Sequence, residues 1–247
     1  MNLGLIGKTL KHSFSENYFN QKFEQQHLNN FSYKNFELET IKDLKKTVDK
    51  YKLNGFNVTI PYKETILPFL DELDETAKEI KAINTVKVIN KKGKNILKGY
   101  NTDVFGFHQL IKPFFKARHE RVLILGTGGA SKAVAYLLKK QYGVSILYAS
   151  RKPTHGNIIN WDDINDNVIH FHKMIVNTTP LGMFPNEEEC PPLPFNSVGN
   201  EHLLVDLIYN PLETKFLKKA KEKNAVTLNG LTMLHQQAEA SWKIWTE

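Results

Sequence analysis

A lysine directly after a short apolar run is the first side chain of this sequence that could do chemistry. Residues 55–60 read GFNVTI, which is typical of a buried strand; Pro61 stops that strand and Lys63 follows. Pro61 suits a helix start and lysines usually lie at surfaces, so a solvated lysine is one interpretation. The other is a lysine at the mouth of a cleft that donates a proton or stabilises developing negative charge.

Two serines follow the first apolar run in the same way. Ser13 and Ser15 stand after NLGLIG, residues 2–7, and just where a helix is expected to begin. The first turn of a helix favours an anionic group, so both hydroxyls are candidate ligands. Ser15 alone would equally suit the N-cap of that helix.

A glycine-rich turn, GTGGAS at 126–131, lies between an apolar strand and an amphipathic helix. Such a turn lets backbone N–H groups approach a pyrophosphate, although a tight turn without a ligand can look the same. The next strand ends in Ser150, Arg151 and Lys152, where an NAD site usually has an acid. Two cations and no acid favour NADP over NAD, with an exposed turn as the alternative.

The elements that must position these residues alternate between strand and helix, which predicts two α/β domains with mostly parallel sheets. In the first half the expected strands are 2–7, 32–38, 55–60 and 84–90, and Gly93 marks an antiparallel hairpin at 90–95. The second half, from Arg121, reads as a doubly wound, Rossmann-like unit. Two such domains predict an active site in the cleft between them.

Composition excludes several classes of protein. The 247 residues carry a net charge of +7, but the lysines alternate with acids along helix-like stretches, and there is no zinc-finger spacing or aromatic RNA-binding signature. We therefore expect no nucleic acid partner and no metal. No run approaches the ~18 apolar residues of a membrane helix and no leader pattern opens the chain, so we expect a cytoplasmic protein without membrane contact.

The sequence resembles the shikimate dehydrogenase family. The matching motifs span nearly the whole chain in the family's order: HSFS at 12–15, NVTIPYK at 57–63, AINT at 82–85, GYNTD at 99–103, GTGGAS at 126–131, NTTPLGM at 177–183, DLIYNP at 206–211 and NGLTMLHQQA at 229–238. This resemblance implies a shikimate-pathway oxidoreductase that reduces 3-dehydroshikimate to shikimate with NADPH, on the way to chorismate and the aromatic amino acids.

The same resemblance implies roles for individual residues. Lys63 and Asp103 would be the catalytic pair, with proton donor and electrostatic anchor both open for the lysine. Substrate would be bound by Ser13, Ser15, Thr59, Asn84, Tyr209 and Gln237. Cofactor would be bound by Gly126, Gly128, Gly129, Ala130, Ser150, Arg151, Lys152, Asn177, Thr178 and Gly230.

Because Gln237 follows the cofactor half, we expect a discontinuous substrate domain, 1–102 and 231–247, around an NADP-binding domain, 103–230. The protein would be a monomer or a homodimer whose partner is a small molecule. A quinate/shikimate dehydrogenase with relaxed cofactor choice and a non-catalytic NADP sensor are the alternatives.

Three positions depart from the family pattern. Glu16 and Phe19 replace a proline and a histidine, and Ser150 stands where asparagine is usual. They bear on the roles of the two serines and on the cofactor preference.

Overall fold

The computed structural model describes residues 1–10, 13–153 and 156–247. It divides into two compact units: unit 1 comprises Met1–Thr102 and Ala238–Glu247, and unit 2 comprises Asp103–Gln237. The last helix, α9 (Leu231–Thr246), therefore begins in unit 2 and ends in unit 1. The sequence-based boundaries lie after residue 102 and before residue 231, so the return point in the structure is seven residues later (238 against 231).

Unit 1 contains a mixed sheet in the order β2-β1-β3-β5-β6-β4. Its strands and helices are β1 (Asn2–Gly7), α1 (Phe14–Gln25), β2 (Ser32–Glu37), α2 (Leu44–Tyr51), β3 (Gly55–Val58), α3 (Tyr62–Thr65), β4 (Glu72–Leu73), α4 (Glu75–Ile80), β5 (Thr85–Lys91) and β6 (Lys94–Tyr100). The strand β1 pairs in parallel with β2 and β3, whereas β5 runs antiparallel to β3 and β6. The predicted hairpin at Gly93 is thereby confirmed.

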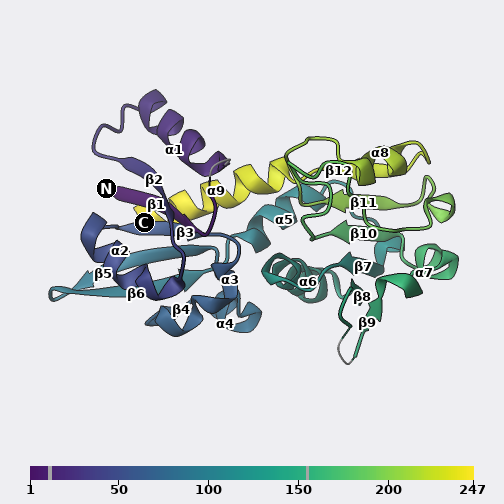
Figure 1. Ribbon diagram of the computed structural model, residues 1–247, viewed down its shortest axis with the longest axis horizontal. Helices are drawn as coiled ribbons and strands as arrows, with labels where there is room; N and C mark the ends of the chain where they lie inside the picture. The colour runs from purple at the N-terminus through teal and green to yellow at the C-terminus, as the bar shows by residue number, and fades with distance from the viewer. Residues whose placement is uncertain (11–12, 154–155) are drawn as a thin grey trace. The chain divides into compact units, whose positions relative to one another are not determined.

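Unit 2 contains a parallel sheet in the order β12-β11-β10-β7-β8-β9 (Figure 1). Its elements are α5 (Asp103–Ile111), β7 (Arg121–Leu125), α6 (Gly129–Tyr142), β8 (Ser145–Ser150), β9 (Ile158–Asn160), α7 (Asp166–Phe171), β10 (Met174–Asn177), β11 (Leu203–Asp206), α8 (Lys215–Lys221) and β12 (Val226–Leu228). Single-turn 3-10 helices lie at Ile41–Asp43, Leu67–Phe69, Ala117–His119, Trp161–Asp163 and Phe195–Ser197. The prediction of two α/β halves is confirmed, and β7, β10 and β11 are buried runs, as expected for a sheet covered on both faces.

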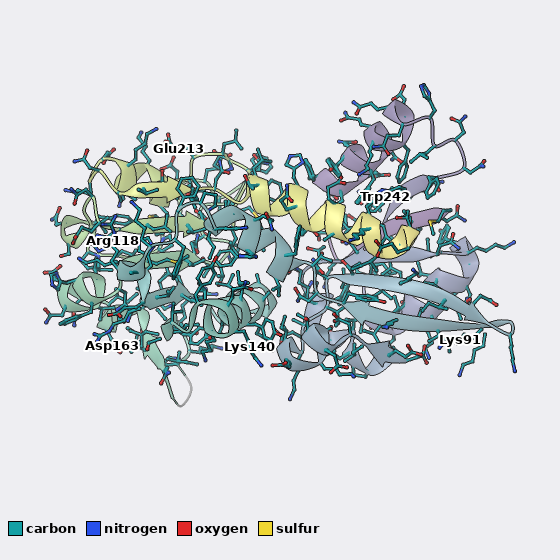
Figure 2. The ribbon with its side chains drawn as sticks, turned by 180° about the vertical axis from the view of Figure 1, so that it is seen from behind. Lys91, Arg118, Lys140, Asp163, Glu213 and Trp242 are labelled. Carbon is teal, nitrogen blue, oxygen red and sulfur yellow. The ribbon has the colours of Figure 1, made fainter. Side chains whose placement is uncertain are left out.

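Both ends of the chain lie in unit 1, as Figure 1 marks. The end of α9 is held there by Trp245, whose indole N–H donates to the Val86 carbonyl at 3.0 Å. Its ring lies where a Cβ on Gly55 would approach within 2.3 Å, so only glycine fits at that position. Trp242, labelled in Figure 2, packs on Phe23 and Phe31 with ring centroids 5.5 and 5.2 Å apart. Aromatic packing therefore sets the register of α9 on unit 1.

None of the helices in the described part of the chain is long and apolar enough to cross a bilayer.

Candidate active site

The two predicted serines lie at the start of α1. Ser13 is the residue before the helix and makes no side-chain cap. Its buried Oγ finds no hydrogen-bond partner among the described residues. A buried hydroxyl without a partner costs free energy, so this atom suits a ligand oxygen. The HSFS motif begins at His12, which lies outside the described residues.

Ser15 is buried and its hydroxyl is hydrogen-bonded to that of Tyr33. Burial raises the pKa of Tyr33 well above its usual value, against the opposing effect of the Ser15 hydrogen bond, so Tyr33 stays a neutral phenol. Phe19, which replaces the family histidine, is fully buried and stacks on Tyr33 with centroids 4.6 Å apart. Phe19 at this position therefore contributes to the packing of unit 1. Glu16, the other replacement, is half-buried on the same helix.

Lys63 lies on the short helix α3, directly after the loop that ends β3. The side chain is half-buried, and its own carbonyl accepts a hydrogen bond from the Ile83 N–H at 2.7 Å. Thr59, in the loop before α3, is also half-buried, and its N–H donates to the Ile6 carbonyl at 2.9 Å. Both residues follow the carboxyl end of β3, the edge of a sheet at which ligands of α/β proteins usually bind.

Asn84 precedes β5 and is almost fully buried. Its Oδ1 accepts from the Thr102 N–H at 2.7 Å and from the Thr85 hydroxyl at 3.1 Å, while its Nδ2 donates to the Thr102 hydroxyl at 2.9 Å. A backbone N–H can only donate, so the Thr102 contact fixes which amide atom is oxygen. The Asn84 side chain is thus held in a fixed orientation.

Asp103 is the first residue of α5, where the helix dipole favours a carboxylate, and it is 4% exposed. It opens unit 2, whereas Lys63 lies in unit 1. Their role as a catalytic pair stays a prediction.

The glycine-rich turn joins β7 to α6, the strand-to-helix context that a dinucleotide site requires. Gly126 has φ +103°, and a Cβ there would meet the Thr178 hydroxyl oxygen at 2.9 Å. At Gly128, by contrast, a Cβ would meet nothing within 4 Å. Gly128 is the N-cap of α6 and is exposed, so a ligand can approach the backbone at this point. This turn, with Gly129 and Ala130 as the first residues of α6, fits a pyrophosphate bound by backbone N–H groups.

The end of β8 supplies two exposed cations, Arg151 and Lys152. The hydroxyl of Ser150, the last residue of β8, accepts from the Lys152 N–H at 3.2 Å, which forms a small turn. Ser150 therefore has a local structural role in place of the usual asparagine. Exposed cations at this point suit a ribose 2′-phosphate.

Asn177 is the last residue of β10 and is hydrogen-bonded to a carboxylate for which the sequence predicts no role. Its Nδ2 donates at 3.1 Å to Asp206, which also accepts from the Thr214 hydroxyl at 2.6 Å and from the Ile208 N–H at 3.1 Å. Burial raises the pKa of Asp206 to about 6, although these three hydrogen bonds oppose the shift. Asp206 thus fixes both Asn177 and the segment that leads to Tyr209.

The remaining predicted site residues of unit 2 have different surroundings. Thr178 is half-buried and its hydroxyl donates to the Leu125 carbonyl at 2.7 Å. Burial raises the pKa of Tyr209. Close packing requires a glycine at position 230, because a Cβ there would approach the Leu207 carbonyl oxygen to 2.1 Å. Gln237 is buried on α9, and its Nε2 donates to the Leu234 carbonyl at 2.9 Å.

The structure thus brings the predicted residues into separate groups. Hydrogen bonds connect Ser15 with Asn84 in unit 1, and Thr178 adjoins Gly126 in unit 2. Six polar residues of these hydrogen-bonded groups carry no sequence-based prediction: Tyr33, Asn57, Thr85, Thr102 and Ser241 in unit 1, and Asp206 in unit 2. Four of them lie within the family motifs: Asn57, Thr85, Thr102 and Asp206. Their place in these motifs is the signal from which a role could have been predicted.

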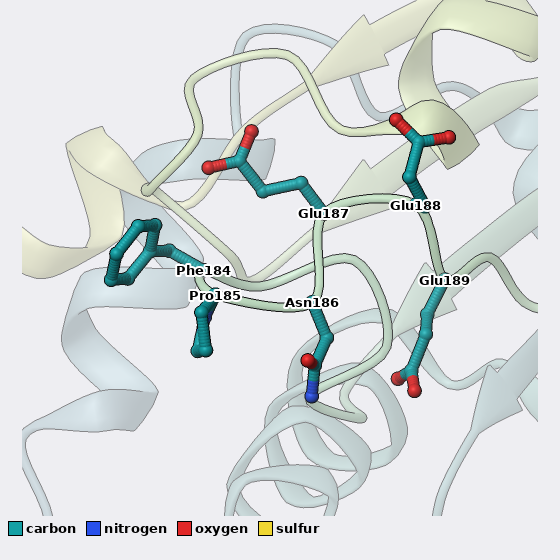
Figure 3. Close-up of a pocket in the computed structure, with 6 residues that line it drawn as sticks. All are labelled: Phe184, Pro185, Asn186, Glu187, Glu188 and Glu189. Atoms are coloured by element: carbon teal, nitrogen blue, oxygen red, sulfur yellow. The ribbon is translucent and has the colours of Figure 1, made fainter.

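An open hollow in unit 2 is lined by the loop Phe184–Glu189 (Figure 3). Three consecutive glutamates line it, so it would repel an anionic ligand. In Figure 3 the Glu188 and Glu189 side chains point in opposite directions, so they do not converge on a cation. Across the described ranges, no group of three or more His, Cys, Asp or Glu side chains could hold a metal ion.

Comparison with known proteins identifies the family of this chain. Residues 5–86 match the family described as the shikimate dehydrogenase substrate binding domain. The chain is 37% identical to the shikimate dehydrogenase (NADP(+)) of Methanosphaera stadtmanae, over 98% of this chain and 90% of that protein.

Solved structures give the same result. The crystal structure of shikimate dehydrogenase from Aquifex aeolicus has a TM-score of 0.86 at 38% identity, over 99% of this chain and 92% of that one. The Thermus thermophilus enzyme, in complex with NADP(H) and shikimate, has a TM-score of 0.84 at 28% identity, over 100% and 93% of the two chains. Since identity above 35% to a curated member extends over nearly its full length, this chain belongs to the shikimate dehydrogenase family.

Proposed function

We propose that this protein catalyses the reversible, NADPH-dependent reduction of 3-dehydroshikimate to shikimate, a step of the shikimate pathway toward chorismate and the aromatic amino acids. The observation that carries the proposal is the 37% identity with an NADP(+)-dependent shikimate dehydrogenase over 98% of the chain. The protein is thus an oxidoreductase that acts on a CH–OH group.

In the direction of reduction, the carbonyl carbon accepts a hydride and the carbonyl oxygen accepts a proton. NADPH supplies the hydride when it is bound. We assign the proton, or the charge that stabilises the alkoxide, to Lys63, and the orientation of that lysine to Asp103. The half-buried position of Lys63 beside the carboxyl end of β3 supports this role, because partial burial strengthens its interaction with a developing alkoxide.

Substrate recognition belongs to unit 1 in this proposal, together with Tyr209 and Gln237. Shikimate carries one carboxylate and three hydroxyls, and the candidate residues offer hydroxyl and amide groups of matching kind. The unpartnered Oγ of Ser13 and the half-buried Thr59 support contacts with substrate oxygens. A site of paired hydrogen bonds rejects an analogue that lacks a hydroxyl, because its own buried groups would stay unpaired.

The residues of unit 2 fit NADP(H). The open approach at Gly128, the first turn of α6 and the exposed cations Arg151 and Lys152 suit a pyrophosphate and a 2′-phosphate. We place the nicotinamide near Asn177, Thr178 and Gly230. In domain terms, 103–230 would bind the cofactor, and 1–102 with 231–247 the substrate. We also propose that the protein acts in the cytoplasm as a monomer or a homodimer.

The test is the formation of reduced cofactor by the purified protein, with shikimate and quinate each paired with NADP⁺ and with NAD⁺. The proposal predicts the highest kcat/KM with shikimate and NADP⁺. A protein that binds NADP⁺ and oxidises neither acid would instead be a cofactor sensor. Higher kcat/KM with quinate and NAD⁺ would make it a quinate dehydrogenase.

A further inference from the structure

A continuous chain of buried hydrogen bonds runs through unit 1 and connects two candidate substrate residues. It begins at Ser15, which is hydrogen-bonded to the Tyr33 hydroxyl, and the Tyr33 O–H donates to Asn57 Oδ1 at 2.8 Å. The Nδ2 of Asn57 then donates to the Ser241 hydroxyl oxygen at 2.9 Å. Ser241 lies on α9, so the C-terminal helix completes the chain.

From Ser241 the chain continues to the second candidate residue. The Ser241 and Thr85 hydroxyl oxygens lie 2.7 Å apart, and the Thr85 O–H donates to Asn84 Oδ1 at 3.1 Å. The Nδ2 of Asn84 donates to the Thr102 hydroxyl at 2.9 Å. Thr102 is the residue before Asp103, so the chain ends next to the predicted catalytic carboxylate.

The direction of donation along this chain follows from the groups themselves. Asn57 Nδ2 also donates to the Asn84 carbonyl at 3.1 Å, and a carbonyl can only accept, so the Asn57 amide cannot be reversed. Ser241 accepts from Asn57, and its hydroxyl oxygen also lies 2.7 Å from that of Thr85 and 3.2 Å from that of Thr102. Thr85 in turn donates to Asn84. Asn57 Nδ2 also lies 3.1 Å from the Thr85 hydroxyl, so Ser241 reinforces this direct contact through shorter bonds to both side chains.

Burial makes each of these links costly to lose. The exposed fractions of Asn57, Asn84, Thr85 and Ser241 lie between 0 and 4%. A polar group without its partner at such a depth costs about 1–3 kcal/mol, so the side chains keep the partners that the chain gives them. Ser241 also lies one turn before Trp245 and one turn after Gln237, on the same helical face. The Trp245 bond to Val86 therefore holds Ser241 in register with the sheet.

We infer that Ser241 is a positioning residue for the substrate, which acts through Asn57 and Thr85 to hold Ser15 and Asn84 in matched orientations. The inference rests on the proposed function, because it takes these two residues as ligands of shikimate. The hydroxyl of Ser241 on the C-terminal helix then supports both the Asn57 side chain, on the way to Ser15, and the Thr85 side chain, on the way to Asn84.

The test is Ser241→Ala, assayed in the intact protein with shikimate and NADP⁺. We expect the KM for shikimate to rise about 10-fold, which corresponds to one buried hydrogen bond. The KM for NADP⁺ should stay within about twofold of the wild type. Thr47→Val, at a buried threonine of α2 outside the chain, is the matched control and should change neither constant.

A second variant tests the continuity of the chain. Tyr33→Phe removes the O–H that orients Asn57, and it should also raise the KM for shikimate. If both residues act through one chain, the double variant should show a smaller increase than the product of the two single increases. Tyr33→Phe also carries the test if Ser241→Ala does not fold.

Three results would overturn the inference. They are an unchanged KM for shikimate in an active Ser241→Ala protein, an equal rise in both KM values, and independent, multiplicative effects in the double variant. A wild-type protein that does not oxidise shikimate would instead refute the proposed function itself, and the inference with it.

Discussion

The two units organise their buried polar groups in different ways. In unit 1, neutral hydroxyls and amides form a chain from Ser15 to Thr102, and none of its links depends on a charged group. In unit 2, a buried carboxylate, Asp206, accepts hydrogen bonds from Asn177 and Thr214, and the predicted cofactor contacts include backbone groups at Gly126–Ala130. Neutral networks give orientation that does not change with pH, whereas a buried carboxylate makes its unit sensitive to protonation.

The largest expected effect separates the chemistry of Lys63, in unit 1, from cofactor binding in unit 2. Lys63→Ala should lower kcat by about 10²–10⁴, since a positioned acid group contributes that much, and should leave the dissociation constant of NADP⁺ unchanged. The measurements are steady-state kinetics and cofactor fluorescence titration. If NADP⁺ affinity fell by the same factor as kcat, Lys63 would contribute to cofactor binding, and chemistry and cofactor binding would not be separable.

The second prediction concerns the charged centre of unit 2. The pKa of Asp206 is about 6 in the folded protein and 3.8 ordinarily, so the folded state binds more protons between these values. Stability therefore falls as pH rises from about 4 to about 6. Relative to Asp206→Asn, the wild type should lose about 2 kcal/mol of unfolding free energy over this range, measured by urea denaturation. A constant difference between the two proteins would contradict a buried, protonated carboxyl.

The third prediction compares two glycines of one turn. Gly126→Ala should destabilise the protein by about 1–3 kcal/mol, because its φ is +103° and the new Cβ would crowd Thr178. Gly128→Ala has free space and an ordinary φ, so stability should change by less than about 0.5 kcal/mol. If a pyrophosphate approaches at Gly128, however, this variant should bind NADP⁺ about 10-fold more weakly. Thermal denaturation and cofactor titration measure the two effects, and unchanged NADP⁺ affinity in Gly128→Ala would remove the pyrophosphate from this turn.

The smallest expected effect concerns cofactor choice. Arg151→Ala should weaken NADP⁺ binding about 10-fold through the loss of one exposed, charge-assisted contact, and leave NAD⁺ binding unchanged. Lys140→Ala, at an exposed cation of α6 labelled in Figure 2, controls for the overall charge of unit 2. Equal weakening of both cofactors, or the same loss in the control, would exclude a 2′-phosphate contact at Arg151.

The sequence predicted the parts of the fold that depend on local patterns. The apolar runs of β1, β7 and β10, the hairpin turn at Gly93 and the strand–turn–helix at 126–131 each carry their own signal within a few residues. It did not indicate α5 as a helix, because Asp103–Ile111 contains Gly106 and aromatic residues of low helix propensity.

In the candidate site, too, the residues with a local signal were predictable and those that depend on tertiary contacts were not. Ser13, Lys63 and Gly128 each lie within six residues of the end of a strand, and strand ends can be predicted from sequence. The contact of Asn57 with Ser241 joins residues 184 positions apart, and it forms only because Trp245 and Trp242 seat α9 on unit 1. In the sequence, Asp206 is likewise an ordinary residue at the end of a strand. Its hydrogen-bond partners Thr214 and Asn177 are known only from the structure. Tertiary packing, which a single sequence does not display, created these partners.

The most direct test of the division between the units is a crossed measurement on Ser241→Ala and Gly128→Ala. For each variant, the KM for shikimate at saturating NADP⁺ and the dissociation constant of NADP⁺ are determined beside the wild type. The account predicts that Ser241→Ala changes only the shikimate constant and Gly128→Ala only the NADP⁺ constant, each by about 10-fold. If either variant weakens both ligands equally, substrate and cofactor recognition do not belong to separate units and the account is wrong.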